Sequence, residues 1–190
     1  LHERSSVPAD ELDAPAPDDQ ALEQILRAGL TAPDHGGLRP WHFIVIRDDA
    51  RARLGEVFAR ATRQRAPATT GEELERIRAK PLRAPLIIAV AARIDPDNPK
   101  IPVIEQLLSA GAAAQQIALA ARALGYGAVW LTGANAHDAS VGEALGLDFD
   151  DRLVAFLHVG MPRNGFPTRA RPALEEHVTQ WREERTLETL

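Results

Sequence analysis

Residues 32–44, with the sequence Ala-Pro-Asp-His-Gly-Gly-Leu-Arg-Pro-Trp-His-Phe-Ile, lead from a predicted helix into a predicted strand through two glycines. Gly36 and Gly37 have no Cβ atom, so another flat molecule can approach their backbone closely. His35 and Arg39 flank this pair and offer polar groups to such a molecule. An ordinary helix-to-strand connection has a similar composition. The stretch therefore indicates either a plain loop or a ligand-binding loop. Features elsewhere in the sequence distinguish these two interpretations.

The composition is that of a globular protein without cysteine chemistry. A chain of 190 residues with 45% hydrophobic residues can build one sizeable core, so we expect residues 1–190 to form a single domain. The net charge of −5 argues against a general nucleic-acid surface. The absence of cysteine excludes disulfides, thiolate catalysis, iron–sulfur clusters and Cys-ligated zinc. The six histidines form no HxxxH or HExxH pair, so we expect no metal site.

The sequence also carries no membrane or export signal. No apolar run reaches the roughly 18 residues of a membrane span. The first residues do not resemble a signal peptide. We therefore expect a cytoplasmic protein with no membrane association.

Hydrophobic periodicity and cap residues predict a mixed order of helices and strands. The first helix begins at the Asp18 cap and is ended by Pro33. Further helices are expected over residues 49–64, 72–80, 103–124, 138–145 and 172–184. Strands are expected over residues 41–47, 85–92, 128–131 and 152–159. The helix over 103–124 has small residues on every face, so we expect it to pack from several sides at the centre of the molecule.

The chain lacks the common nucleotide and hydrolase motifs. It contains neither GxGxxG after a strand nor GxxxxGK[ST], and its Ser5 and Ser6 lie outside any GxSxG turn. If the protein is an enzyme, we expect its chemistry to belong to a bound cofactor.

Three segments together resemble the nitroreductase family of flavin enzymes. Residues 4–7, Arg-Ser-Ser-Val, are similar to its Arg-Arg-Ser-Val element. Residues 32–43 are similar to its Ala-Pro-Ser-Gly-Gly-Asn-x-Gln-Pro-Trp-x-Phe element. Residues 124–133, Leu-Gly-Tyr-Gly-Ala-Val-Trp-Leu-Thr-Gly, are similar to its Leu-Gly-Leu-Gly-x-x-Trp-x-x-Gly stretch. Each segment alone is a weak signal, but the three occur in order and at sensible spacing.

The resemblance implies an α+β sandwich with a mostly antiparallel central sheet flanked by helices. It implies an intertwined homodimer with two FMN molecules at the subunit interface. It further implies ping-pong catalysis, in which NADH or NADPH reduces FMN and FMN then reduces a nitroaromatic compound, a quinone or a similar acceptor. FAD is not expected, because no adenosine-binding element is found.

The resemblance also implies the residues that bind FMN. Arg4 would pair with the phosphate, because a guanidinium suits phosphate bidentately, and Ser5 and Ser6 belong to the same element. Pro8 stands where the family often has another basic residue. Arg169 and Arg171 are therefore expected to add phosphate contacts, although a basic surface loop is the alternative reading.

In the middle element, His35 is expected to contact the ribityl chain or the phosphate, and Arg39 the O2 and N1 region of the flavin. The strip formed by Trp130, Leu131, Thr132 and Gly133 is expected to run along the flavin, mainly through its backbone. No catalytic side chain can be assigned.

Two alternatives stay open at this point. The chain could be a flavin-binding carrier or sensor without turnover, or a flavin enzyme of the same fold with a different reaction. The segments 63–80 and 94–103, which would cover the substrate, are short and polar or proline-rich. Their composition does not identify the acceptor.

Overall fold

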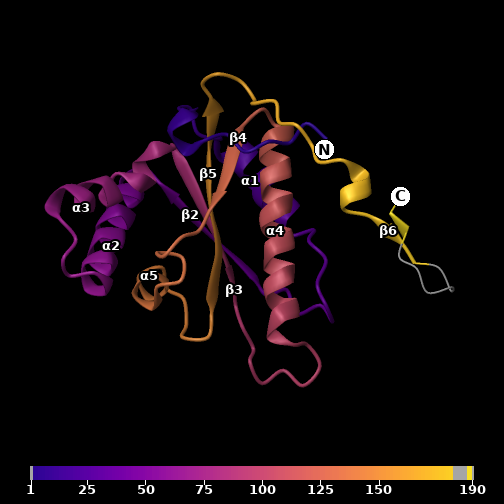
Figure 1. Cartoon of the computed structure of the whole chain (residues 1–190). Coiled ribbons are helices and arrows are strands. Elements are labelled where there is room, and N and C mark those ends of the chain that lie inside the picture. The colour runs from indigo at the N-terminus through magenta and orange to yellow at the C-terminus, as the bar shows by residue number, and fades with distance from the viewer. Residues whose placement is uncertain (1, 182–187, 190) are drawn as a thin grey trace.

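The computed structural model describes residues 2–181 and 188–189. Its helices and strands, in chain order, are η1 (Ala9–Glu11), β1 (Leu12–Asp13), α1 (Asp19–Gly29), β2 (Trp41–Arg47), α2 (Asp49–Arg65), α3 (Gly71–Arg78), η2 (Lys80–Arg83), β3 (Leu86–Ala92), α4 (Val103–Ala123), β4 (Gly127–Leu131), α5 (Ala139–Ala144), β5 (Arg152–Pro162), η3 (Leu174–Glu176), β6 (Thr179–Gln180) and β7 (Glu188–Thr189). Figure 1 shows their arrangement.

The main sheet has the strand order β1-β5-β3-β2, and β4 also pairs with β5. Every strand pairing among the described residues is antiparallel. One row across the sheet joins Val45 in β2, Ile88 in β3, Leu157 in β5 and Trp130 in β4. The α+β class and the mostly antiparallel sheet expected from the sequence are confirmed.

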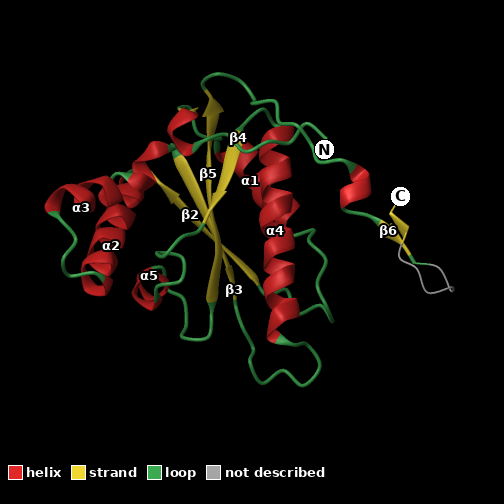
Figure 2. Ribbon diagram, viewed as in Figure 1, coloured by secondary structure: helices red, strands yellow, loops and turns green. Residues whose placement is uncertain are grey.

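The side-chain alternation of β3 separates the two helical layers, because successive residues of a strand point to opposite faces. Leu86, Ile88 and Val90 pack in the cluster that includes residues of α1 and α4. Ile87 and Ala89 pack in the cluster that includes residues of α2 and α5. Figure 2 shows α1 and α4 on one side of the sheet and α2, α3 and α5 on the other. All seven residues of β3 are buried, so this strand lies at the centre of the core.

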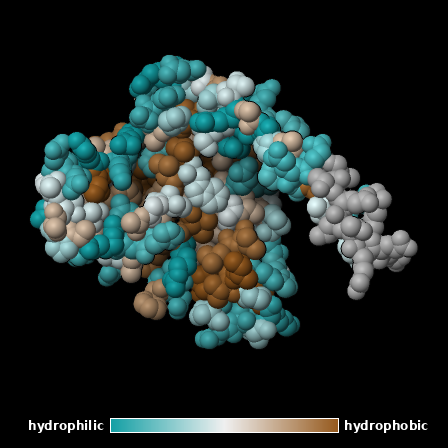
Figure 3. All heavy atoms as spheres, viewed as in Figure 1, coloured by the Kyte–Doolittle hydropathy of each residue, from teal (hydrophilic) through white to brown (hydrophobic). Residues whose placement is uncertain are grey.

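Helix α4 packs against the sheet and against α1, but part of its surface is not covered by the described residues of this chain. Its small residues Ala110, Ala113 and Ala114 are fully buried on the sheet side. On the outer side, Ile104 and Leu108 are 60% and 65% exposed. Figure 3 shows a hydrophobic patch over the N-terminal half of this helix. The single chain therefore leaves one apolar side of its longest helix uncovered.

The predicted helix over residues 172–184 is wrong. The described part of this segment contains only the short 3-10 helix η3 and the strand β6, which pairs with β7; residues 182–184 lie outside the described part. Leu174 and Trp181, which were to form its apolar face, are 63% and 81% exposed. An amphipathic helix gains most of its stability from packing its apolar face, and the described part of the chain leaves these side chains exposed.

The other predicted helices and strands are found within a few residues of their expected ends. Asp18 caps α1 as expected, with Oδ1 accepting a hydrogen bond from the Ala21 N–H at 2.8 Å. The start of α3 is fixed by a capping box between Thr70 and Glu73, which the sequence interpretation overlooked.

Candidate functional site

The loop between α1 and β2 holds its shape through three left-handed residues. Gly36, Gly37 and Arg39 have φ angles of 66°, 72° and 53°. A Cβ atom on Gly36 would lie 3.1 Å from Ile101 Cδ1, so this glycine also permits a close approach to the loop before α4. The first glycine thus serves both the turn and the packing of the loop.

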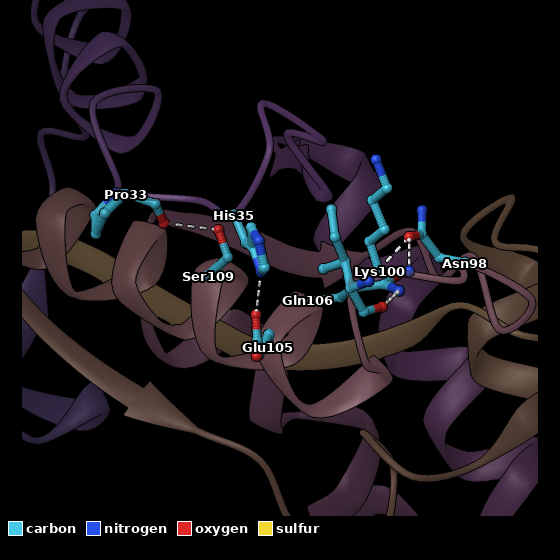
Figure 4. Close-up of polar contacts among 8 residues, drawn as sticks. Pro33, His35, Asn98, Lys100, Glu105, Gln106 and Ser109 are labelled. Carbon is cyan, nitrogen blue, oxygen red and sulfur yellow. Dashed lines mark hydrogen bonds and ion pairs between the residues drawn. The ribbon is translucent and has the colours of Figure 1, made fainter.

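This loop is seated on the first turns of α4. Glu105 Oε2 lies 2.5 Å from His35 Nδ1, and Ser109 Oγ donates a hydrogen bond of 2.9 Å to the Pro33 carbonyl. Figure 4 shows both contacts reaching up from the same helix to the loop. Glu105 was not among the residues singled out in the sequence, because nothing local connects it with a histidine 70 positions away.

A buried glutamine holds the loop that precedes α4. Gln106 is 1% exposed, and its amide nitrogen donates to the Asp95 and Ile101 carbonyls at 2.8 and 3.0 Å. Its amide oxygen accepts from the Asp95 N–H at 2.9 Å. Asn98 Oδ1 accepts from the N–H groups of Lys100 and Ile101. The segment before α4 is therefore fixed by polar contacts (Figure 4).

Arg39 presents its charge to solvent. Its backbone N–H donates to the Asp34 carboxylate. Its side chain is exposed, and its guanidinium has no hydrogen-bond or ion-pair partner among residues 2–181 and 188–189. The guanidinium is thus available to a ligand.

The N-terminal residues form a second group beside β4. The Val7 N–H donates to the Ala128 carbonyl at 3.1 Å, which places the preceding residues next to this strand. The Ser5 hydroxyl is buried and has no partner in the described part of the chain. Arg4 is half-buried, and its guanidinium likewise has no partner there.

The C-terminal tail joins this group through one of its two predicted arginines. Arg171 Nη2 donates to the His2 carbonyl at 3.2 Å and to the Arg4 carbonyl. Arg169 is exposed and contacts no residue of this group in the described part of the chain. The structure therefore brings Arg171, Arg4, Ser5 and Ser6 together and leaves Arg169 apart.

The strip Trp130–Gly133 begins in the last residues of β4 and lies beside the middle of α4. Trp130 Nε1 donates to the Val154 carbonyl at 3.2 Å, and its ring lies 3.9 Å from the Cβ position of Gly111. Trp130 and Leu131 are 38% and 40% exposed, and Thr132 is exposed. Gly133 has a φ of 71°, so the chain turns away there. The exposed backbone and the Thr132 hydroxyl are open to a ligand.

The loop with His35 and the N-terminal group with Arg4 lie at opposite ends of α4. His35 contacts Glu105 in the first turn, whereas Glu3, next to Arg4, pairs with Arg122 in the last turn at 3.4 Å. Seventeen residues of α-helix separate Glu105 from Arg122, which is about 25 Å. Within one chain, the loop with His35 therefore contacts the first turn of α4, and the segment next to Arg4 contacts its last turn.

A surface pocket of about 860 Å³ lies between the start of α4, α5 and the end of the α5–β5 loop. Its walls include Leu107, Ala136, Phe149 and Val154. None of the predicted site residues lines it.

A histidine two positions beyond the loop has a lowered pKa. Burial lowers the pKa of His42, the Arg93 cation lowers it further, and Asp151 acts in the opposite direction.

Elsewhere in the described residues, no three His, Asp or Glu side chains are grouped so as to hold a metal ion. Nor does any described helix have the length and apolarity needed to cross a membrane.

The comparisons with known proteins agree with this architecture. The sequence profile of the Nitroreductase family matches residues 3–161. The Escherichia coli (strain K12) protein named "Putative NAD(P)H nitroreductase YdjA" is 40% identical over 155 residues, which cover 82% of this chain and 83% of that protein.

Two solved structures extend the likeness to the fold. The nitroreductase-like family protein from Bacillus cereus has a TM-score of 0.79 and 25% identity, and the match covers 96% of this chain and 93% of that one. The "putative nitroreductase in complex with fmn" from Desulfovibrio desulfuricans has a TM-score of 0.70 and 29% identity, with 95% and 94% covered. With its sequence matched over most of its length and its fold shared, the chain belongs to the nitroreductase family.

Proposed function

We propose that this chain is an FMN-dependent oxidoreductase that uses NADH or NADPH to reduce a nitroaromatic compound, a quinone or a similar acceptor. We propose further that residues 1–190 form one FMN-binding domain and that two chains form a homodimer with two shared sites. In each site, the N-terminal group and the Trp130–Gly133 strip come from one subunit, and the loop with His35 and Arg39 comes from the other. A cytoplasmic location suits the use of NADH or NADPH.

The observation that carries this proposal is that the loop with His35 and Arg39 lies at one end of α4 and the N-terminal group with Arg4 lies at the other. A second chain packed on the uncovered side of α4 would bring the loop of one subunit toward the N-terminal group of the other. The exposed Ile104 and Leu108 supply the apolar surface for such packing.

The residues of the N-terminal group fit a phosphate. The Arg4 guanidinium is without a partner in the described residues, and the buried Ser5 hydroxyl lacks one as well. A buried hydroxyl without a hydrogen bond is costly, and a phosphate oxygen would satisfy it. Arg171 would add a second cation from the tail.

Bound FMN would supply the redox chemistry by taking a hydride from NADH or NADPH and passing electrons to the acceptor. The Arg39 guanidinium would place a positive charge beside the pyrimidine edge, where negative charge develops on reduction. The Thr132 hydroxyl and the backbone near Gly133 would donate hydrogen bonds along the ring. We assign no side chain as general acid, so solvent supplies the proton.

The relatives support the choice of cofactor and donor. The Desulfovibrio desulfuricans structure is a complex with FMN, and the name of the Escherichia coli relative specifies NAD(P)H. A direct test is the absorption spectrum of the purified protein, followed by anaerobic titration with NADPH and NADH. We expect one FMN per chain and rapid bleaching. A protein that is yellow but never bleaches would support a carrier, and a protein that takes up no added FMN would refute the cofactor.

Mixed dimers test whether the site is shared. Arg4→Ala and His35→Ala homodimers each carry the same defect in both sites. After subunit exchange, a shared arrangement places both defects in one site of the mixed dimer and restores the other. We therefore expect the mixture to regain one tight FMN site per mixed dimer, measured by fluorescence titration. No recovery, with exchange verified by mass spectrometry, would show that each site lies within one chain.

A further inference from the structure

The contact between His35 and Glu105 joins two segments that are 70 positions apart in the sequence. His35 belongs to the loop after α1, and Glu105 to the first turn of α4. Their 2.5 Å separation joins side chains that are 55% and 44% exposed. Exposed ion pairs add little to stability. The contact is therefore weak evidence for stability, but it fixes where the His35 ring lies relative to α4.

We infer that Glu105 is a positioning residue of the flavin site, which holds His35 through Nδ1 and thereby presents Nε2 to the FMN. The inference rests on the proposed function. It assigns a role to a residue that does not itself reach the cofactor.

The chemistry of the carboxylate decides which ring nitrogen is held. An ionised carboxylate only accepts hydrogen bonds, so it selects the form of His35 that carries a proton on Nδ1. Nε2 then faces away from Glu105 and has no partner among the described residues. A neutral ring would accept a hydrogen bond from a ribityl hydroxyl through Nε2. A protonated ring would donate from Nε2 to a phosphate oxygen.

Both supports are fixed by further contacts, so the imidazole is held at a defined place. One helical turn beyond Glu105, Ser109 donates to the Pro33 carbonyl, and Ser109 is only 6% exposed. On the other side of the loop, Gly36 lies against Ile101. Gln106 in turn ties the Ile101 carbonyl to α4. The loop is thus anchored to the same turns of the helix that carry Glu105 (Figure 4).

The first test reads the ring of His35 directly in the flavin-free protein. Long-range nitrogen–proton NMR distinguishes the two neutral tautomers, and the His35 signal is the one absent from His35→Gln. We expect the Nδ1–H form in the wild type and in Glu105→Gln, whose amide oxygen still accepts. We expect Glu105→Ala to lose this preference. A wild-type ring protonated on Nε2 alone would overturn the inference.

The second test is a double-mutant cycle on FMN affinity. Glu105→Ala should weaken FMN binding by about 3- to 30-fold in the wild-type background and by less than about 2-fold in His35→Ala. Glu23→Ala, which removes another exposed carboxylate paired with an arginine on α1, should leave the affinity unchanged. Thermal unfolding should change little in any of these variants.

The outcomes separate the inference from the proposed function. If the wild type binds FMN but Glu105→Ala has the same effect with and without His35, Glu105 does not act through His35 and the inference fails alone. If the wild type binds no FMN, the proposed function fails and the flavin-directed role fails with it. In that case the tautomer measurement would still show whether Glu105 orients the ring.

Discussion

At the scale of single residues, Arg4 and Arg39 are expected to serve different parts of FMN. Arg4→Ala should weaken FMN binding about 10- to 100-fold, because a hydrogen bond between charged groups contributes about 1.5–3 kcal/mol. Excess FMN should restore its activity. Arg39→Ala should retain FMN but lower the midpoint potential by about 20–40 mV, because a cation beside the ring favours the reduced state. Flavin titration and potentiometry on both variants measure these effects.

Arg39→Lys is the matched control for the second effect. Arg39 has a φ of 53°, and both lysine and alanine carry a Cβ atom, so the two variants share the same backbone cost. Lysine keeps the positive charge and should keep the potential near that of the wild type. An unchanged potential in Arg39→Ala would make Arg39 an ordinary loop residue and remove the chemical reason for placing the loop against the flavin.

At the scale of an element, strand β5 carries a buried histidine that ties stability to pH. His158 is 4% exposed. Burial lowers its pKa and the Arg83 cation acts the same way, while hydrogen bonds with the Phe156 and Lys80 backbones oppose the shift. The unfolded chain binds this proton below about pH 6.5, where the folded chain still excludes it. The free energy of unfolding should therefore be largest above pH 6.5 and fall on acidification.

Urea unfolding between pH 7.5 and 5.5 measures this dependence. Each excluded proton contributes a slope of up to about 1.4 kcal/mol per pH unit. His158→Leu should flatten the dependence of the unfolding free energy on pH. Part of the dependence should remain in this variant, because the pKa of His42 is also lowered. The pKa values of Asp13 and Asp138 are lowered from 3.8, so these groups act only at lower pH. The exposed His177 provides the control His177→Gln, and an equal flattening in that variant would remove His158 as the cause.

At the scale of the whole molecule, the uncovered side of α4 is expected to be the centre of the dimer interface. Ile104 and Leu108 are one helical turn apart and more than half exposed. The double variant Ile104→Glu/Leu108→Glu should place charges there, shift the sedimenting species from twice 20.7 kDa to one chain, and weaken FMN binding. Leu82→Glu, on η2, changes another exposed leucine and should stay dimeric. A wild-type monomer that retains flavin would contradict both the dimer and the shared site.

The sequence by itself determined the features that depend on local patterns. The continuous apolar run of β3 predicts a strand buried on both faces, and the structure confirms it. The positions of helices α1 to α5 and strands β2 to β5 follow from periodicity and caps in the same way. The three ordered motifs indicated the family because they are short stretches that can be compared directly.

The tertiary structure alone decided which of these features meet. Glu105 approaches His35 across 70 residues, and no local pattern predicts a contact that depends on how α4 crosses the loop. It also placed the loop at the start of α4 and the segment next to Arg4 at the end of the same helix. The predicted helix after Pro172 failed for the same reason. Periodicity describes an apolar face, but only packing decides whether that face finds a surface to cover it.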